Sequence, residues 1–226
     1  MKQKILCNIV LALLLSVAAF AEDSIAVKLP KKQIYYGTMV KFDILSPVLI
    51  CGLNNWQMQH YEVAVNVRLA KRWYPTLELG YTGGKTHNDT VSYKGQGGFF
   101  RVGCDVNPLK KRPDSPHALL LGLRIGTAMQ QFDQDCEKKV ASTLATDQPY
   151  INNYVGARAD CWGEIVAGCQ VEIAKVNNTA FYMGWMGRFK FLFTRTEAEK
   201  APIYIPGYGS RDNTAWGANY YLGWKF

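Results

Sequence analysis

Beyond residue 21, the 226-residue sequence has no apolar run long enough to cross a membrane as a helix. It contains three histidines, and no G-x-S-x-G, H-E-x-x-H, P-loop or calcium-loop motif is present. We therefore expect neither a helical membrane protein nor one of the enzyme classes that these motifs define.

Cysteine is scarce and shows no pairing pattern. Cys7 lies in the predicted signal segment, and the five remaining cysteines form no C-x-x-C pair. An odd number without such pairs indicates neither a zinc site nor a complete disulfide framework, so we expect no metal and no cofactor. A single disulfide between Cys136 and Cys161 stays open on the sequence alone.

The excess of positive charge is modest. Lys and Arg number 26 against 18 Asp and Glu, a formal net charge of +8. No stripe of basic residues alternates with aromatic residues that could stack on bases. The sequence therefore predicts no nucleic-acid partner.

The N-terminus has the pattern of a secretory signal. Lys2 and Lys4 precede an apolar run at 9–18, and small residues at positions 19 and 21 fit a cleavage site between Ala21 and Glu22. The alternative is a membrane anchor, but the run is shorter than the roughly 18–20 apolar residues of a spanning helix. We expect three parts: a signal peptide, a short periplasmic segment and a barrel, at 1–21, 22–34 and 35–226.

The most regular pattern is the final segment, from Trp216 to Phe226. Alternate positions are apolar or aromatic, and the positions between them are small or polar. Because side chains on a strand point alternately to opposite faces, this segment predicts a strand with one apolar face. Such a strand is typical of a transmembrane β-barrel, which meets lipid on one side and a packed interior on the other.

The same period of two predicts eight strands, at about 35–45, 61–69, 73–81, 99–106, 119–126, 159–173, 181–193 and 216–226. Short turns alternate with long connections, as in outer-membrane barrels; the long connections are 46–60, 84–95, 130–156 and 194–213. The prediction is an all-β protein: an eight-stranded antiparallel up-and-down transmembrane β-barrel whose polar interior is filled by side chains.

Two features favour an apolar face that points outward into lipid. The polar face is rich in glycine, which suits a narrow interior, and the apolar face carries aromatic residues near the strand ends, as membrane-interface belts do. The alternative is a soluble barrel or sandwich with its apolar face inward. Leu120 and Met186 depart from the pattern, because both lie on the polar face.

Acidic and basic residues nearly balance on the predicted inner face. Balanced charge in a narrow lumen favours a paired network that closes the barrel, since unpaired buried ions are costly. The alternative is a gated proton or ion path through a small channel, in which one sign of charge would be expected to dominate. The predicted interior charge network consists of Asp43, Arg68, Glu78, Arg101, Asp105, Arg124, Glu164 and Arg188.

The long connections are where a surface function would lie. Ile203, Tyr204, Ile205 and Tyr208 form an apolar stretch that either docks a partner or covers the barrel mouth. A competing hypothesis is a lipid-modifying enzyme of the outer leaflet, such as a lipid A acyltransferase or deacylase, and its candidate residues are His87, Asp89 and Ser92. Nothing in this polar loop holds a base against a nucleophile, so we expect no catalytic residues.

Several short stretches resemble an uncharacterised, domain-of-unknown-function family of small outer-membrane barrels from Gram-negative bacteria. They are Tyr35-Tyr36-Gly37, Leu77-Glu78-Leu79-Gly80-Tyr81, Phe100-Arg101-Val102-Gly103, Gly122-Leu123-Arg124-Ile125-Gly126 and Tyr204-Ile205-Pro206-Gly207-Tyr208. The architecture is more loosely similar to OmpA-type eight-stranded barrels, and the aromatic final residue, Phe226, resembles their assembly signal. The resemblance implies a bacterial outer-membrane location and supplies no catalytic residue.

Together these observations predict a non-enzymatic outer-membrane protein with a closed lumen. Its expected partners are outer-membrane lipid and, through the outer loops, a surface protein or glycan that the sequence does not identify. We expect a monomer.

Overall fold

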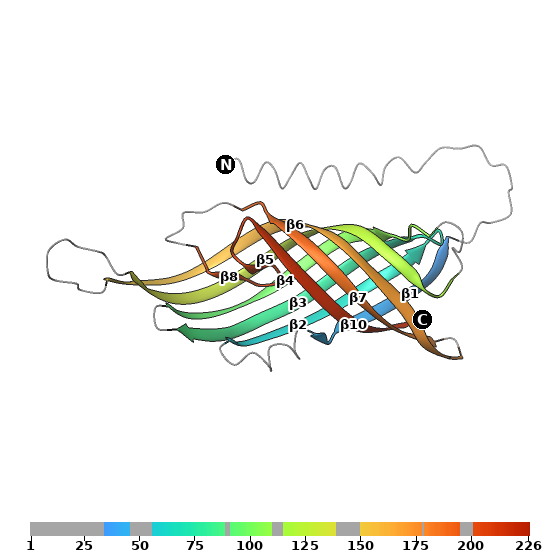
Figure 1. Ribbon diagram of the computed structural model, residues 1–226, viewed down its shortest axis with the longest axis horizontal. Helices are drawn as coiled ribbons and strands as arrows, with labels where there is room; N and C mark the ends of the chain where they lie inside the picture. Colours follow the sequence, from blue (N-terminus) through green and yellow to red (C-terminus); the bar gives the residue numbers. More distant parts are fainter. Residues whose placement is uncertain are drawn as a thin grey trace. The chain divides into compact units, whose positions relative to one another are not determined.

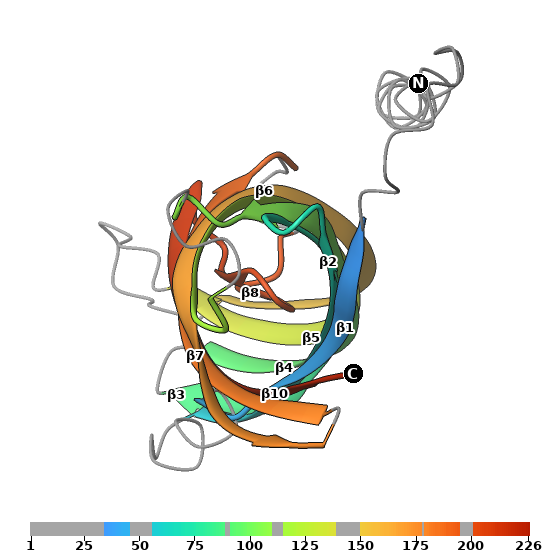
Figure 2. The same cartoon turned by 90° about the vertical axis from the view of Figure 1, so that its right-hand side faces the viewer.

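The computed structural model describes residues 34–45, 56–88, 91–109, 115–138, 150–177, 179–194 and 201–226. These residues form a closed barrel of eight antiparallel strands, in the order β1-β10-β7-β6-β5-β4-β3-β2 (Figures 1 and 2). The prediction of an all-β, eight-stranded up-and-down barrel is confirmed. The predicted signal peptide and cleavage site lie outside the described residues. Among the residues described, no helix is both long and apolar enough to span a membrane.

The barrel strands increase in length toward the middle of the sequence. They are β1 (Tyr35–Asp43), β2 (Trp56–Leu69), β3 (Trp73–Asn88), β4 (Val91–Val106), β5 (Ala118–Lys138), β6 (Tyr150–Val176), β7 (Thr179–Leu192) and β10 (Thr214–Lys225). Two further strands, β8 (Tyr204–Ile205) and β9 (Gly209–Ser210), pair with each other in a separate small sheet.

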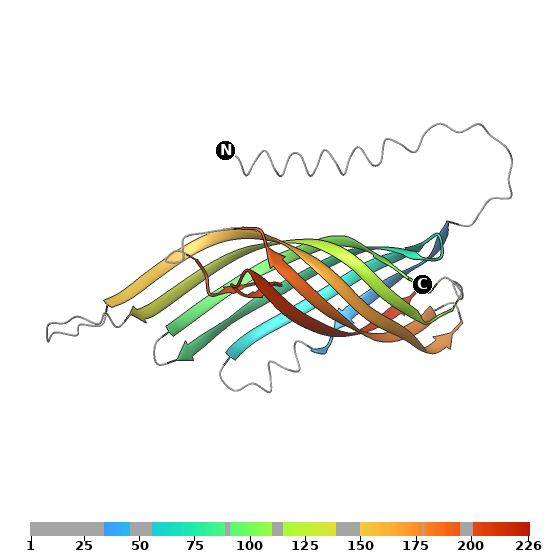
Figure 3. The ribbon, with the colours of Figure 1, turned by 45° about the horizontal axis from the view of Figure 1, so that its top comes forward.

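Several predicted loops are in fact strand. The connection predicted at 84–95 is a tight hairpin, since β3 runs to Asn88 and β4 starts at Val91. Likewise β5 and β6, with 21 and 27 residues, take up much of the connection predicted at 130–156 and extend beyond the other strands (Figure 3). The regular apolar alternation ends in these segments, where polar residues and glycines interrupt the outward face, although backbone pairing continues. Sequence periodicity alone therefore ended these strands too early.

The short turns use residues in the left-handed region. Ala70 and Lys71, between β2 and β3, have φ of 46° and 67°, and Asn177, between β6 and β7, has φ of 53°. Val176 pairs with Thr179, so Asn177 starts a two-residue hairpin loop, where asparagine is a favoured residue. Gly37 has φ of 121° at a register shift between β1 and β2, which places a bulge near the start of the barrel wall.

The polar face points inward and the apolar face outward. Leu123 and Trp185 are 65% and 53% exposed, and a wide set of large apolar side chains shares this outer surface. Leu120 and Met186, the two exceptions to the sequence pattern, point inward and pack with Tyr74, Val166 and Tyr221. The exceptions thus form an apolar cluster inside the barrel, which fills part of its interior without charge.

The disulfide left open between Cys136 and Cys161 is not formed. Cys161 is a free thiol and pairs in register with Thr127 on β5. Cys136 lies nine residues (136 − 127) further along β5, which corresponds to about 30 Å at the usual rise of a strand. Disulfide geometry requires Cα atoms within about 7 Å, so the two thiols cannot meet.

Candidate functional site

One carboxylate in the barrel interior contacts three guanidinium groups. Oε2 of Glu78 lies 2.7 Å from Nη1 of Arg101 and 2.8 Å from Nη1 of Arg188. Its Oε1 lies 3.1 Å from Nε of Arg124, and Arg124 also contacts Asp105 at 2.7 Å. All of these side chains are buried. Because an unpaired charge is costly away from water, Glu78 is central to the stability of this interior.

Two more carboxylates link the same arginines. Oε1 of Glu62 lies 3.0 Å from Arg101 and 3.1 Å from Arg188. Glu164 lies 3.2 Å from Nε of Arg101 and 2.9 Å from Nη1 of Arg188. We call this set the charge cluster; it comprises Glu62, Glu78, Arg101, Asp105, Arg124, Glu164 and Arg188.

The strand register brings the charge cluster together. Glu78 on β3 is directly opposite Arg101 on β4, and Arg124 on β5 is directly opposite Glu164 on β6. Each residue lies on the inward face of its strand, so contacts also cross the lumen. Arg188 on β7, for example, reaches Glu78 on the far side of the barrel. Five adjacent strands, β3 to β7, thus contribute side chains to one network, and β2 adds Glu62.

Most of the residues predicted for the interior network lie in the charge cluster, but two do not. Asp43 lies beside it and accepts a hydrogen bond at 2.8 Å from Asn219, whose side-chain oxygen accepts from Arg188. Arg68 lies at the turn end of β2, where its Nε donates to the carbonyl of Lys71 at 3.2 Å. Membership of Arg68 in the interior network stays a prediction.

Two members of the site were missing from the predicted network. Glu62 lies on the predicted inner face, but its position relative to Arg101 and Arg188 depends on the register of β2. Asn219 is uncharged, and its inward position in β10 gave the only signal that could have found it. Both would follow from the sequence if strand register could be predicted.

A hairpin from the connection between β7 and β10 enters the barrel above the charge cluster. We call residues 201–212 the plug; its strands β8 and β9 lie within the ring of barrel strands (Figure 2). Pro206 and Gly207 occupy the turn, with Tyr208 N donating to the carbonyl of Ile205 at 3.1 Å and Gly207 at φ 73°. Proline followed by a glycine of positive φ is the sequence of a type II turn, so the tip of the plug is locally encoded.

The tip of the plug is bound by cations of the interior. The Gly207 carbonyl accepts from Arg101 Nη2 at 3.0 Å and from Lys190 Nζ at 2.7 Å, and the Tyr208 carbonyl accepts from Lys190 at 2.9 Å. Burial raises the pKa of Tyr208 to about 12, with a further contribution from Asp212, so its hydroxyl stays protonated and donates to the Asp212 carbonyl at 2.6 Å.

Apolar packing holds the rest of the plug. Ile205 is fully buried, and with Tyr208 it packs against Phe99 and Trp162 of the barrel wall. Of the two alternatives for the stretch of Ile203, Tyr204, Ile205 and Tyr208, the structure places Ile205 and Tyr208 inside the mouth, while Ile203 and Tyr204 are half-buried. Ile205 and Tyr208 therefore face the barrel, and a partner contact through this stretch stays a prediction.

One group of potential metal ligands occurs in the described residues. Ligand atoms of Asp43, His60 and Glu62 lie within 4.8 Å of one another. However, His60 Nδ1 already forms a hydrogen bond with the Thr82 hydroxyl at 2.8 Å. The guanidinium groups of Arg101 and Arg188 beside Glu62 would also repel a bound metal cation. We therefore assign these side chains to the hydrogen-bond network of the interior.

The residues of the enzyme hypothesis lie on the β3–β4 hairpin. His87 is directly opposite Ser92 in the strand register. Asp89 lies outside the described residues. The register therefore brings the base and the hydroxyl candidates to facing positions, and it places Asp135 of β5 opposite Ser92 on its other side. That acid neighbours the hydroxyl and not the base that it would have to orient.

Little space remains among the charges. The cavity bordered by Lys41, Glu62, Glu78, Arg124 and Arg188 has a volume of about 20 Å³. That is room for about one water molecule. The charge cluster and the plug occupy successive levels of the interior. A further cavity of about 250 Å³ is bordered by residues of both, among them Glu62, Arg101 and Tyr208.

These features define a class: a closed eight-stranded antiparallel barrel whose interior is filled by an ion-pair cluster beneath a hairpin plug. The chain belongs to the family described as "Domain of unknown function (DUF6048)", whose model matches residues 2–225. This membership and the barrel agree with the predicted resemblance to an uncharacterised family of barrel proteins. No curated protein matches the sequence.

Proposed function

We propose that this protein is a non-enzymatic outer-membrane β-barrel with a closed lumen, which serves a structural or binding role at the bacterial surface. One observation carries the proposal: the distribution of polarity is the inverse of that in a soluble protein. Arg101, Glu78 and Asp105 are buried, whereas Leu123, Ile165 and Trp185 are more than half exposed. Water would not favour so large an apolar surface, but lipid does.

The dimensions of the outer surface support the same proposal. On β3 the apolar outward positions run from Trp73 to Tyr81. This length matches the roughly 9–11 residues that a tilted strand needs to cross a bilayer. Exposed aromatic side chains lie at both ends of this segment, Trp73 next to the β2–β3 turn and Tyr81 toward the β3–β4 hairpin. Amphipathic rings favour such positions at the membrane–water interface.

Envelope fractionation tests the proposed location. The protein should be recovered with outer membranes, its mature N-terminus should be Glu22 by intact mass, and its mobility on SDS gels should change on boiling, because a closed barrel keeps its fold in the detergent until it is heated. Recovery as a soluble periplasmic protein, with one mobility in both samples, would contradict the proposal.

A closed lumen predicts that the protein conducts no ions across a bilayer. Purified protein in planar bilayers should show no steady single-channel conductance, because the cavity among the charges holds about one water molecule and the plug lies above it. A variant with 203–210 replaced by a short Gly-Ser linker should also stay silent, since the charge cluster alone still fills the cross-section. Stable large currents from the unmutated protein would favour the small-channel alternative.

A further inference from the structure

The outer wall of the barrel changes character along the strands. Leu77, Leu79 and Phe100 are exposed on β3 and β4. Beyond Tyr81, the outward positions of β3 to β5 carry polar groups instead, namely Lys85, Lys94, Gln96, Gln131 and Asp133. The apolar wall therefore ends at Tyr81, and a polar wall begins directly above it.

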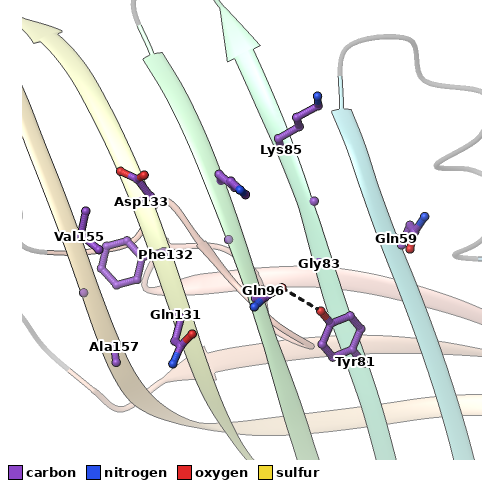
Figure 4. A pocket seen from close by; sticks show the side chains of 14 residues that line it. Gln59, Tyr81, Gly83, Lys85, Gln96, Gln131, Phe132, Asp133, Val155 and Ala157 are labelled. Carbon is purple, nitrogen blue, oxygen red and sulfur yellow. Dashed lines mark hydrogen bonds between the residues drawn. The ribbon is translucent and has the colours of Figure 1, made fainter.

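This polar wall is hollowed. A groove of about 890 Å³ runs over β2 to β6 and is bordered by Lys85, Lys94, Gln96 and Gln131 (Figure 4). Among its lining residues, Gly83 and Ala157 have little or no side chain, which leaves the space open. A neighbouring hollow of about 530 Å³ shares Gln96, Gln131 and Ala157 with the groove and continues toward Met129.

Two lysines face each other in this groove. Lys85 on β3 is directly opposite Lys94 on β4. Side chains in such pairs start only about 5 Å apart, and like charges at directly opposed positions destabilise a sheet. Asp133, opposite Lys94 on β5, offsets one of the two charges and leaves the groove with an excess of positive charge. An anion between the two ammonium groups would remove the repulsion.

Neighbouring side chains supply neutral donors. The Tyr81 hydroxyl donates to Oε1 of Gln96 at 3.3 Å, as the dashed line in Figure 4 shows. Because Oε1 faces Tyr81, the amide nitrogen of Gln96 points away from that ring. Gln131 borders the same groove from β5. Ammonium and amide donors around one hollow are the groups that bind phosphate oxygens.

We propose that this groove binds a phosphorylated lipid of the outer leaflet, with a phosphate between Lys85 and Lys94 and acyl chains along Leu77, Leu79 and Phe100. The inference rests on the proposed membrane location, because it is the apolar wall directly beneath the lysines that selects a lipid over a soluble phosphate. The phosphates of a bilayer lie above its hydrocarbon layer, and Lys85 lies beyond the apolar wall, about 13 Å along the strand from Tyr81.

Lipid titration of the purified full chain tests this assignment. Diphosphorylated lipid A is added to the protein in micelles of a neutral detergent, and binding is followed by native mass spectrometry. The variant Lys85→Gln/Lys94→Gln should bind at least about ten-fold more weakly, since charge-assisted hydrogen bonds to the phosphate are lost. High salt should weaken binding to the unmutated protein, because these lysines are exposed. Lys175→Gln, an exposed lysine at the opposite end of β6, is the matched control and should bind as the unmutated protein does.

Further arms separate the possible outcomes. Lipid A lacking its phosphates should bind the unmutated protein as weakly as the double variant binds the phosphorylated form, and inorganic phosphate alone should not compete at equal concentration. Equal binding of both lipid forms, or an unaffected double variant, would overturn the headgroup site while the barrel remained in the membrane fraction. Effective competition by inorganic phosphate would overturn the lipid as occupant. Recovery of the protein as a soluble periplasmic species would overturn both this site and the proposed function.

Discussion

Replacement of Glu78 by alanine should lower the free energy of unfolding by about 3–5 kcal/mol, because it leaves buried guanidinium groups without their shared partner. Glu78 is 1% exposed and contacts Arg101, Arg124 and Arg188. Urea-induced unfolding in lipid vesicles, followed by tryptophan fluorescence, measures the change. Glu78→Gln should also be strongly destabilised, since it keeps the shape of the side chain but not its charge.

Glu172 provides the matched control. It is half-buried near the turn end of β6 and accepts a hydrogen bond from the Tyr182 hydroxyl at 2.8 Å, away from the charge cluster. Glu172→Ala should therefore cost much less than Glu78→Ala. The double variant Glu78→Ala/Arg124→Ala should be more stable than the sum of its single changes predicts, because the two groups are partners. Equal small effects at positions 78 and 172 would contradict a cluster built around Glu78.

Leu123→Arg should destabilise the protein in a bilayer by about 2–4 kcal/mol, the cost of a basic side chain on the lipid face near the midplane. Leu123 is 65% exposed, and in water an exposed leucine could be replaced at a cost within about 0.5 kcal/mol. The same substitution therefore distinguishes lipid from water at this surface. Unfolding and refolding in vesicles of defined thickness measures the effect.

Gln131→Arg is the control for this measurement. Gln131 lies on the same strand and the same outward face, but above the apolar wall, where a charge remains in water. It should change stability little. If Leu123→Arg were as harmless as Gln131→Arg in the bilayer, the exposed apolar wall would not face lipid, and a soluble barrel would have to be considered.

The sequence pattern was sufficient to predict the eight barrel strands and which side chains lie on each of their two faces. Alternation at Leu121, Leu123 and Ile125 against Gly122 and Arg124 specifies which side chains share a face, because the strand period is two. The near balance of inward charges also predicted a paired network inside the barrel. Both conclusions depend only on local spacing, which is why they could be drawn without knowing which strands contact one another.

What required the structure was the relation between distant strands. The joint contact of Glu78 with Arg101 and Arg188 depends on register and on the curvature of the wall, and neither has a local signal. The plug illustrates the same limit: Pro206 and Gly207 indicate a turn, but its position inside the barrel comes from cations on β4 and β7 that bind its carbonyl groups. Strand ends were also misplaced wherever the regular apolar alternation stopped before the backbone pairing did.

The joint between β1 and β10 has a consequence for the making of the barrel. Among the described residues it consists of five register pairs, Met39–Asp43 against Tyr221–Lys225, whereas β10 and β7 share twelve. The first strand, β1, therefore keeps one unpaired edge until the last strand, β10, pairs with it. Until then we expect the interior arginines to remain hydrated. Closure of the barrel and the exclusion of water from the charge cluster should then occur together, as a late step of folding. In the folded protein, backbone amides of the β1–β10 pairs should exchange with solvent first, because the barrel should open at this joint before it opens elsewhere.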